Sequence, residues 1–153
     1  MKNSDLHDEL FPIPMDELPQ KVVSKMYESD WFSQWLGIDR VKIDQGTCVL
    51  RMTVRKEMLN GFGIAHGGIT YSLADSALAF ASNSHGRMAV SVETSISHTA
   101  QLHEGDIITA TAAEISLTNK IGVYQVTVRN QKEEIVALFK GTVYRTGKEW
   151  FPG

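Results

Sequence analysis

The sequence predicts an α+β fold in which an antiparallel sheet wraps around one long central helix, preceded by a helical extension. Residues 68–84 form an alanine-rich, almost wholly apolar segment that is long enough for a helix. Segments of alternating apolar residues, which are typical of strands, stand on both sides of it. A helix this apolar must be covered nearly all round, and a single sheet curved around it is the simplest cover.

The chain begins with two segments of different character. Residues 1–19 carry three prolines among acidic residues, which predicts a flexible arm ahead of a single domain over residues 20–153. From Gln20 to Leu36 the apolar residues recur at roughly helical spacing. We therefore expect one short helix, or two helical pieces, followed by a turn at Gly37.

Strand patterns fill most of the remaining sequence. Residues 41–43 and 48–54 alternate on either side of Asp44-Gln45-Gly46, which predicts a hairpin before the long helix. After the helix, Val90, Val92 and Ile96 share one strand face. Ile107, Ile115 and Leu117 share a face of the next strand. Three or four strands are thus expected here, over residues 88–98, 107–117, 124–128 and 135–145.

Composition and charge limit the possible functions. A formal net charge of −3, without a cluster of Lys and Arg, argues against a nucleic-acid-binding surface. No apolar stretch is long enough to span a membrane, and the first residues lack the apolar core of a secretory signal. The single cysteine, Cys48, excludes an internal disulfide and a cysteine-based zinc site, so a cytoplasmic location is the default. The histidines show no metal-ligand spacing, and neither a metal nor another cofactor is expected.

The segment from Asn60 to Ser84 carries the residues with chemical potential. Asp75 is an ionisable carboxylate inside an otherwise apolar helix, where it is costly unless it is paired or used. Gly67 and Gly68 place bare backbone N–H groups at the start of the same helix. A helix N-terminus favours negative charge, including an oxyanion that forms during a reaction. One acid and one oxyanion cradle are the minimum for attack on a carbonyl.

The element order and the string Asn60…His66-Gly67-Gly68…Asp75 resemble those of the hotdog-fold acyl-CoA thioesterases. The resemblance is strongest to the branch associated with phenylacetate degradation, and it covers roughly residues 35–147. It implies that Asp75 is the nucleophile or general base and that the Gly67 N–H polarises the thioester carbonyl. It also implies that Asn60 orients the water or the carbonyl, and that the Ser91 hydroxyl lies near the attacking water.

The same resemblance implies an acyl-CoA substrate, with an aryl-acetyl or similarly sized acyl group, and a homodimer that pairs into a homotetramer. The helix geometry supports the dimer independently. Gly67 and Asp75 are 75 − 67 = 8 positions apart, so on one helix their backbones are separated by about 12 Å. Both can act on one carbonyl only if they come from two chains related by a two-fold axis. The candidate substrate- and coenzyme-binding residues are His66, Gly68, Asn119, Lys120 and Arg145.

Structural interpretations of these residues remain open. Asp75 could cap a backbone N–H or pair with a buried base, and the glycines could serve only a turn. Asn60-Gly61 is a common turn dipeptide, Ser91 could be merely a small strand residue, and His66 could support its loop through a hydrogen bond. Aromatic residues of the helical extension could simply pack, or could cover a pocket: Trp31, Phe32 and Trp35.

Two other functions compete on the same scaffold. Hydratases and dehydratases of acyl thioesters resemble this family but use a His and an acid in other positions. Here His66 precedes the mid-helix acid Asp75 by 75 − 66 = 9 positions, which fits the thioesterase pattern better. A non-catalytic acyl-CoA-binding module is the second alternative. A regulator of that kind usually carries a DNA-binding segment, and residues 20–36 are too short and not basic enough for one.

Overall fold

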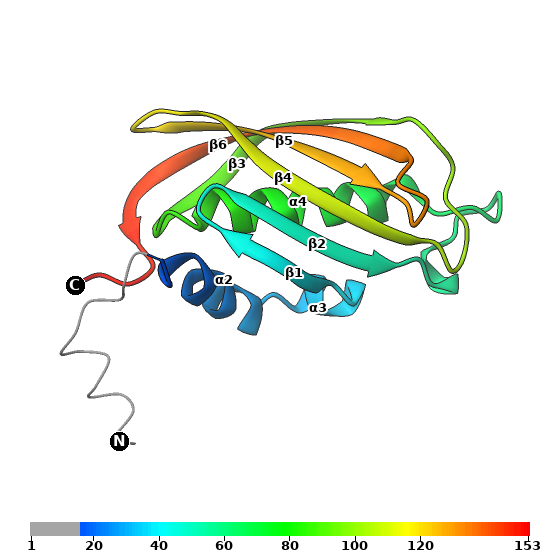
Figure 1. Ribbon diagram of the computed structural model, residues 1–153, viewed down its shortest axis with the longest axis horizontal. Coiled ribbons are helices and arrows are strands. Elements are labelled where there is room, and N and C mark those ends of the chain that lie inside the picture. The colour runs from blue at the N-terminus through cyan, green and yellow to red at the C-terminus, as the bar shows by residue number, and fades with distance from the viewer. Residues whose placement is uncertain (1–15) are drawn as a thin grey trace, which may run out of the picture.

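The computed structural model describes residues 16–153 and has the predicted α+β architecture (Figure 1). The predicted arm, residues 1–19, lies outside the described residues except for its last part, where the first described helix begins at Leu18. The helices and strands, in chain order, are α2 (Leu18–Glu28), α3 (Trp31–Leu36), β1 (Asp39–Asp44), β2 (Thr47–Thr53), the 3₁₀ turn η1 (Lys56–Met58), α4 (Gly67–Asn83), β3 (Arg87–His98), β4 (Ile107–Leu117), β5 (Ile121–Arg129) and β6 (Ile135–Glu149).

The helical extension consists of two pieces, as the sequence predicts. Asp30 separates them and caps α3, because its carboxylate accepts a hydrogen bond from the Ser33 N–H at 3.0 Å. Gly37 ends α3 in the left-handed conformation, with φ of 73°, which glycine adopts without strain. The Ser33 hydroxyl lies 2.8 Å from that of Ser76 on α4, so α3 is seated directly on the central helix.

The six strands form one antiparallel sheet in the order β1-β2-β4-β5-β6-β3. β3 follows α4 in the chain but pairs with β6, so the two edges of the sheet are β1 and β3. Figure 1 shows the long strands arching over α4, with α2 and α3 beside β1. No helix within residues 16–153 is both long enough and apolar enough to cross a membrane.

The core lies between α4 and the concave face of the sheet. In both β2 and β5, the alternating apolar residues that were predicted to share one face are buried, and Tyr124 of β5 is fully enclosed. In β4 the buried residues are instead Ile108, Ala110 and Ala112, and Ile115 is 61% exposed on the other face. Both faces of β4 carry apolar side chains, so alternation alone does not decide which of them meets the helix.

The edge strand β3 has an apolar outer surface. Val90 and Val92 are 56% and 61% exposed, whereas Ile96, which the sequence predicted on the same face, packs against the core. The pairing with β6 shifts register between Ser91 and Glu93. A bulge of this kind interrupts the alternation of side chains, so the predicted shared face of Val90, Val92 and Ile96 is not formed. Among residues 16–153 no strand pairs with the outer edge of β3.

Candidate active site

The N-terminus of α4 presents a free backbone donor. His66 is the N-cap, and its Nδ1 accepts a hydrogen bond from the Gly68 N–H at 2.8 Å. This is the loop-supporting hydrogen bond anticipated for His66. Because it uses the Gly68 N–H, that group is not the bare donor that the sequence predicts. The Gly67 N–H donates to no atom within residues 16–153. Because it lies at the positive end of the helix dipole, it is suited to stabilise an oxyanion.

Asn60 builds the loop that leads to this donor. Its Oδ1 accepts a hydrogen bond from the Phe62 N–H at 2.9 Å, and its own N–H donates to the Ile64 carbonyl at 2.8 Å. The turn role of Asn60 is therefore real, but its side-chain NH₂ group has no protein acceptor within the described chain. Asn60 and Gly67 line the same cavity, of about 390 Å³, so the structure brings these two candidates together.

His98 lies in this cavity and was not identified from the sequence. It ends β3, and a Cβ atom placed on Gly67 would come within 3.0 Å of its Nε2. The imidazole thus covers Gly67 closely, and only glycine fits there without moving the ring. The two residues are 98 − 67 = 31 positions apart, and a single His at a strand end carries no sequence signal.

Asp75 lies in a second cavity, of about 450 Å³, together with Ser91. The carboxylate is half-buried and has no hydrogen-bond or ion-pair partner anywhere in residues 16–153, so it neither caps a helix nor neutralises a buried base. Burial raises its pKa above the ordinary value for aspartate. A raised pKa makes the carboxylate a stronger base, and an unpaired acid in a mostly apolar cavity is a typical catalytic feature.

The two pairs of residues form separate half-sites. Gly67 and Asp75 both belong to α4, so the helical rise separates their backbones by about 12 Å, and they line different cavities. Asp75 also belongs to a stripe of α4 that the rest of the described chain leaves partly open, with Gly68, Ser72 and Ala79. Neither half-site alone holds both the acid and the donor.

The coenzyme-binding candidates divide into two groups. Asn119, Lys120 and Arg145 meet at the β4–β5 turn, where the Arg145 N–H donates to the Lys120 carbonyl at 2.7 Å. The structure adds Arg87 to this group, because its guanidinium donates to the Asn119 side chain at 3.1 Å and to its carbonyl at 2.6 Å. His66 and Gly68 lie instead at the start of α4, so the five candidates do not form one cluster.

Comparison with known proteins decides the family. The model of the thioesterase superfamily matches residues 62–137, which include Gly67, Asp75 and Ser91. The acyl-coenzyme A thioesterase PaaI of Escherichia coli is 43% identical over 122 residues, which cover 80% of this chain and 87% of that protein. The chain belongs to the hotdog-fold acyl-CoA thioesterases. It is therefore an enzyme of the thioester hydrolase class, in the PaaI-like branch.

Solved structures agree with this assignment. The E. coli PaaI protein from the phenylacetic acid degradation operon superimposes on this thioesterase with a TM-score of 0.86 at 38% identity, covering 89% of this chain and 99% of that one. A hypothetical thioesterase with coenzyme A from Streptococcus pneumoniae gives a TM-score of 0.77 at 25% identity, covering 82% and 98%. The predicted hotdog fold is confirmed.

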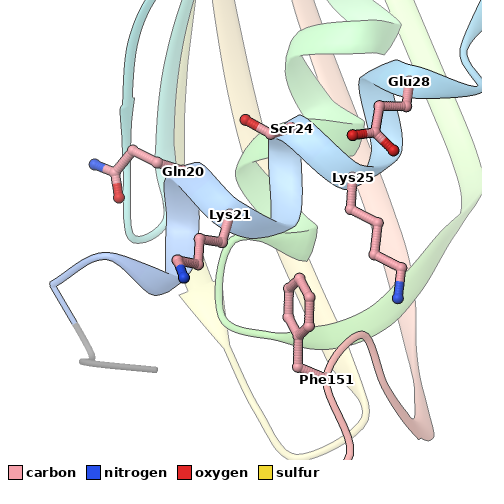
Figure 2. Close-up of a pocket in the computed structure, with 6 residues that line it drawn as sticks. All are labelled: Gln20, Lys21, Ser24, Lys25, Glu28 and Phe151. Atoms are coloured by element: carbon pink, nitrogen blue, oxygen red, sulfur yellow. The ribbon is translucent and has the colours of Figure 1, made fainter. Parts of the chain in front are cut away.

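A third cavity of this thioesterase holds none of the predicted residues. It measures about 430 Å³ and lies between α2 and Phe151 (Figure 2). Its lysines, Lys21 and Lys25, flank the Phe151 ring, which points from the C-terminal tail toward α2. Within residues 16–153 no three His, Cys, Asp or Glu side chains are grouped so as to hold a metal ion.

Proposed function

We propose that this thioesterase hydrolyses aryl-acetyl-CoA, or acyl-CoA of similar size, in sites that two copies of the chain build together. In each site Gly67 and Asn60 come from one copy and Asp75 and Ser91 from the other. The observation that carries this proposal is that donor and acid lie in two different cavities, with the Gly67 and Asp75 backbones about 12 Å apart along α4. A two-fold axis beside α4 unites both pairs of half-sites at once.

The reaction follows from the free groups in each half-site. The thioester carbonyl accepts a hydrogen bond from the Gly67 N–H, and the Asn60 NH₂ group, which has no protein acceptor within the described residues, is a second donor beside it. Asp75 of the other copy takes a proton from a water molecule, whose oxygen attacks the carbonyl carbon. The C–S bond then breaks, and coenzyme A leaves as a thiolate. Direct attack by Asp75, forming a mixed anhydride that water hydrolyses, uses the same groups.

The edge strand β3 is the surface on which two copies would meet. Its outer edge has no partner within the described chain, and Val90 and Val92 expose apolar side chains beside it. An unpaired edge of this length is a template for another strand. Antiparallel pairing of β3 with a second copy would join two sheets and bring the open stripe of α4 against its counterpart. Pairing of two such dimers would give the homotetramer.

Two observations support a compact acyl group. The cavity beside Asp75 is about 450 Å³ and mostly apolar, which lies in the range of small-molecule sites. The similar E. coli protein comes from a phenylacetic acid degradation operon.

The cationic cluster of Arg87, Lys120 and Arg145 is a candidate contact for the coenzyme phosphates. The one cysteine, Cys48, is a buried free thiol, and a thiol of this kind is compatible with the proposed location in a reducing cytoplasm.

The first experiment measures free-thiol release from a panel of acyl-CoAs: phenylacetyl, hydroxyphenylacetyl, benzoyl, and short and long straight chains. The wild type should hydrolyse the aryl-acetyl thioesters fastest, and Asp75→Asn should lose at least about 10²-fold in turnover. Asp44→Asn, the same change on an exposed β1 side chain, is the matched control. Full activity of Asp75→Asn would exclude this mechanism.

A backbone donor can also be tested, because Gly67 is the first residue of α4. Proline is tolerated at that position and lacks the N–H group, and the extended His66 backbone accommodates it. Gly67→Pro should therefore lower turnover by about 10²–10³-fold more than Gly67→Ala, which keeps the donor and places a similar Cβ against His98. Equal losses in the two variants would assign the effect to crowding of His98.

Mixing the two inactive variants tests whether the site is shared. A dimer of one Asp75→Asn chain and one Gly67→Pro chain has one site with both groups intact and one with neither. Random re-association makes half of the dimers mixed, so about a quarter of the wild-type activity should return. No recovery after verified exchange of chains would mean that each chain carries a complete site.

A further inference from the structure

The cavity beside Asp75 has a defined far end. It runs between α4 and β3 from Asp75 and Ser91 to Asn83, where Met26 of α2 and Trp150 of the C-terminal tail complete its lining. Trp150 follows β6 and lies beyond the residues that match the family model, 62–137. The C-terminal tail thus contributes to this wall from outside the residues that the family model covers.

Trp150 is fixed in place by a buried amide. Its indole Nε1 donates a hydrogen bond to the Asn83 Oδ1 at 2.8 Å, and its backbone N–H donates to the Gly86 carbonyl at 2.9 Å. Asn83 is only 2% exposed, and its NH₂ group donates to the carbonyls of Ala79 and Ala89 at 2.8 and 3.1 Å. The same Oδ1 also accepts a hydrogen bond from the Ala89 N–H at 2.9 Å, so every polar atom of this amide is used. If the indole swung away, Oδ1 would lose one of its two donors and the indole N–H would lose its acceptor.

The tail is also held from the other side. Lys25 of α2 donates a hydrogen bond to the Trp150 carbonyl at 3.1 Å, and its ammonium lies 4.8 Å from the centre of the Phe151 ring. Figure 2 shows Phe151 rising from the tail toward α2, next to Lys25. Trp150 is thus clamped between α4 and α2.

We propose that the acyl group lies in this cavity and that Trp150 sets the greatest acyl length that the enzyme accepts; this rests on the hydrolysis proposed above. Asp75 and Asn83 are 83 − 75 = 8 positions apart on α4, which corresponds to about 12 Å. An extended chain advances about 1.2 Å per bond, as a protein backbone does over the three bonds of each residue. The cavity therefore holds acyl chains of about ten carbons or fewer, and an aryl-acetyl group fits within it.

The test compares acyl lengths within each enzyme preparation. We would measure kcat/KM for straight-chain acyl-CoAs from C2 to C16 with the wild type, Trp150→Ala and Trp150→Phe. Each methylene in an apolar pocket is worth roughly a tenfold or greater discrimination. Trp150→Ala should therefore raise the C14/C8 ratio of kcat/KM at least about tenfold. Trp150→Phe, which keeps a ring but loses the bond to Asn83, should give a smaller rise. Trp31→Ala is the matched control, because this side chain of α3 is 72% exposed and lines none of the three cavities described above, so the ratio should not change.

The ratio is internal to each preparation, so a partly unfolded variant does not distort it. An unchanged C14/C8 ratio in Trp150→Ala, with an active wild type, would overturn the role of Trp150. If the wild type hydrolysed no acyl-CoA, the proposed function would fail. The same comparison would then be made with dissociation constants of the acyl-CoAs measured by calorimetry, where the same shift in ratio is expected and its absence would again overturn the inference.

Discussion

Gly141→Ala is predicted to destabilise the enzyme through one contact between β6 and α4. A Cβ atom on Gly141 would lie 2.4 Å from the Leu78 Cδ2 and 3.0 Å from its Cδ1. Carbon atoms in contact are normally about 3.5–4.0 Å apart, so Leu78 must move by more than 1 Å. Leu78 is only 1% exposed, and it also lines the cavity beside Asp75. The added methyl group would push it toward that cavity.

Overpacking of this kind typically costs about 1–3 kcal/mol. For a chain of this size, each kcal/mol corresponds to about 2–4 °C in Tm, so the expected loss is roughly 2–12 °C. Thermal unfolding followed by circular dichroism would measure it. If Leu78 moves into the cavity, the longest accepted acyl chain should also become shorter in the thiol-release assay.

Gly147→Ala is the matched control on the same strand, because a Cβ there meets no atom within 4 Å. Both variants share the small stabilisation that alanine gives by restricting the unfolded chain, so the difference between them isolates the contact with Leu78. Adding Leu78→Val to Gly141→Ala should recover part of the loss. If Gly141→Ala melted within about 1 °C of Gly147→Ala, the close packing described here would be incorrect.

Three further outcomes are expected. Burial raises the pKa of Asp75 in the folded protein above its value in the unfolded chain. The ionised carboxylate therefore destabilises the fold at a pH above the folded-state pKa, and this penalty disappears at a pH below the unfolded-state pKa. Asp75→Asn should therefore melt higher than the wild type at pH 7, and this advantage should shrink toward pH 4 in a series of thermal melts. Val92→Glu should place a charge on the outer side of β3 and convert the assembly to monomers in analytical ultracentrifugation, whereas Val41→Glu on the other edge strand should not. Burial raises the pKa of Cys48 to about 12, so its thiol should react with Ellman's reagent at pH 8 only after unfolding.

Local patterns predicted the elements of the fold because each element has its own signal. A few neighbouring residues suffice to predict the left-handed Gly37, the turn at Gly46 and the alanine-rich helix α4. The sequence could not predict which face of β4 is buried, because Ile108 and Ile115 are equally apolar and only the packing of α4 distinguishes them.

The site was predictable only where its residues are close in sequence. Asn60, Gly67 and Asp75 fall within one loop and helix, so their spacing carries information. His98 and Trp150 enter the two cavities from distant parts of the chain, and an isolated His or Trp gives no local sign of its neighbours. Arg87 joins the Asn119 turn only because β3 pairs with β6.

The strand order of the sheet has a consequence for how the enzyme is made. β3 is complete at His98, but its only partner within the described chain is β6 (Ile135–Glu149), which comes later in the sequence than β4 and β5. Before β6 is made, β1 can already pair with β2, while β3 must wait with an apolar edge exposed. Ser91 and the surface proposed to join two copies are therefore organised last. Assembly at this strand becomes possible only after β6 has left the ribosome and paired with β3.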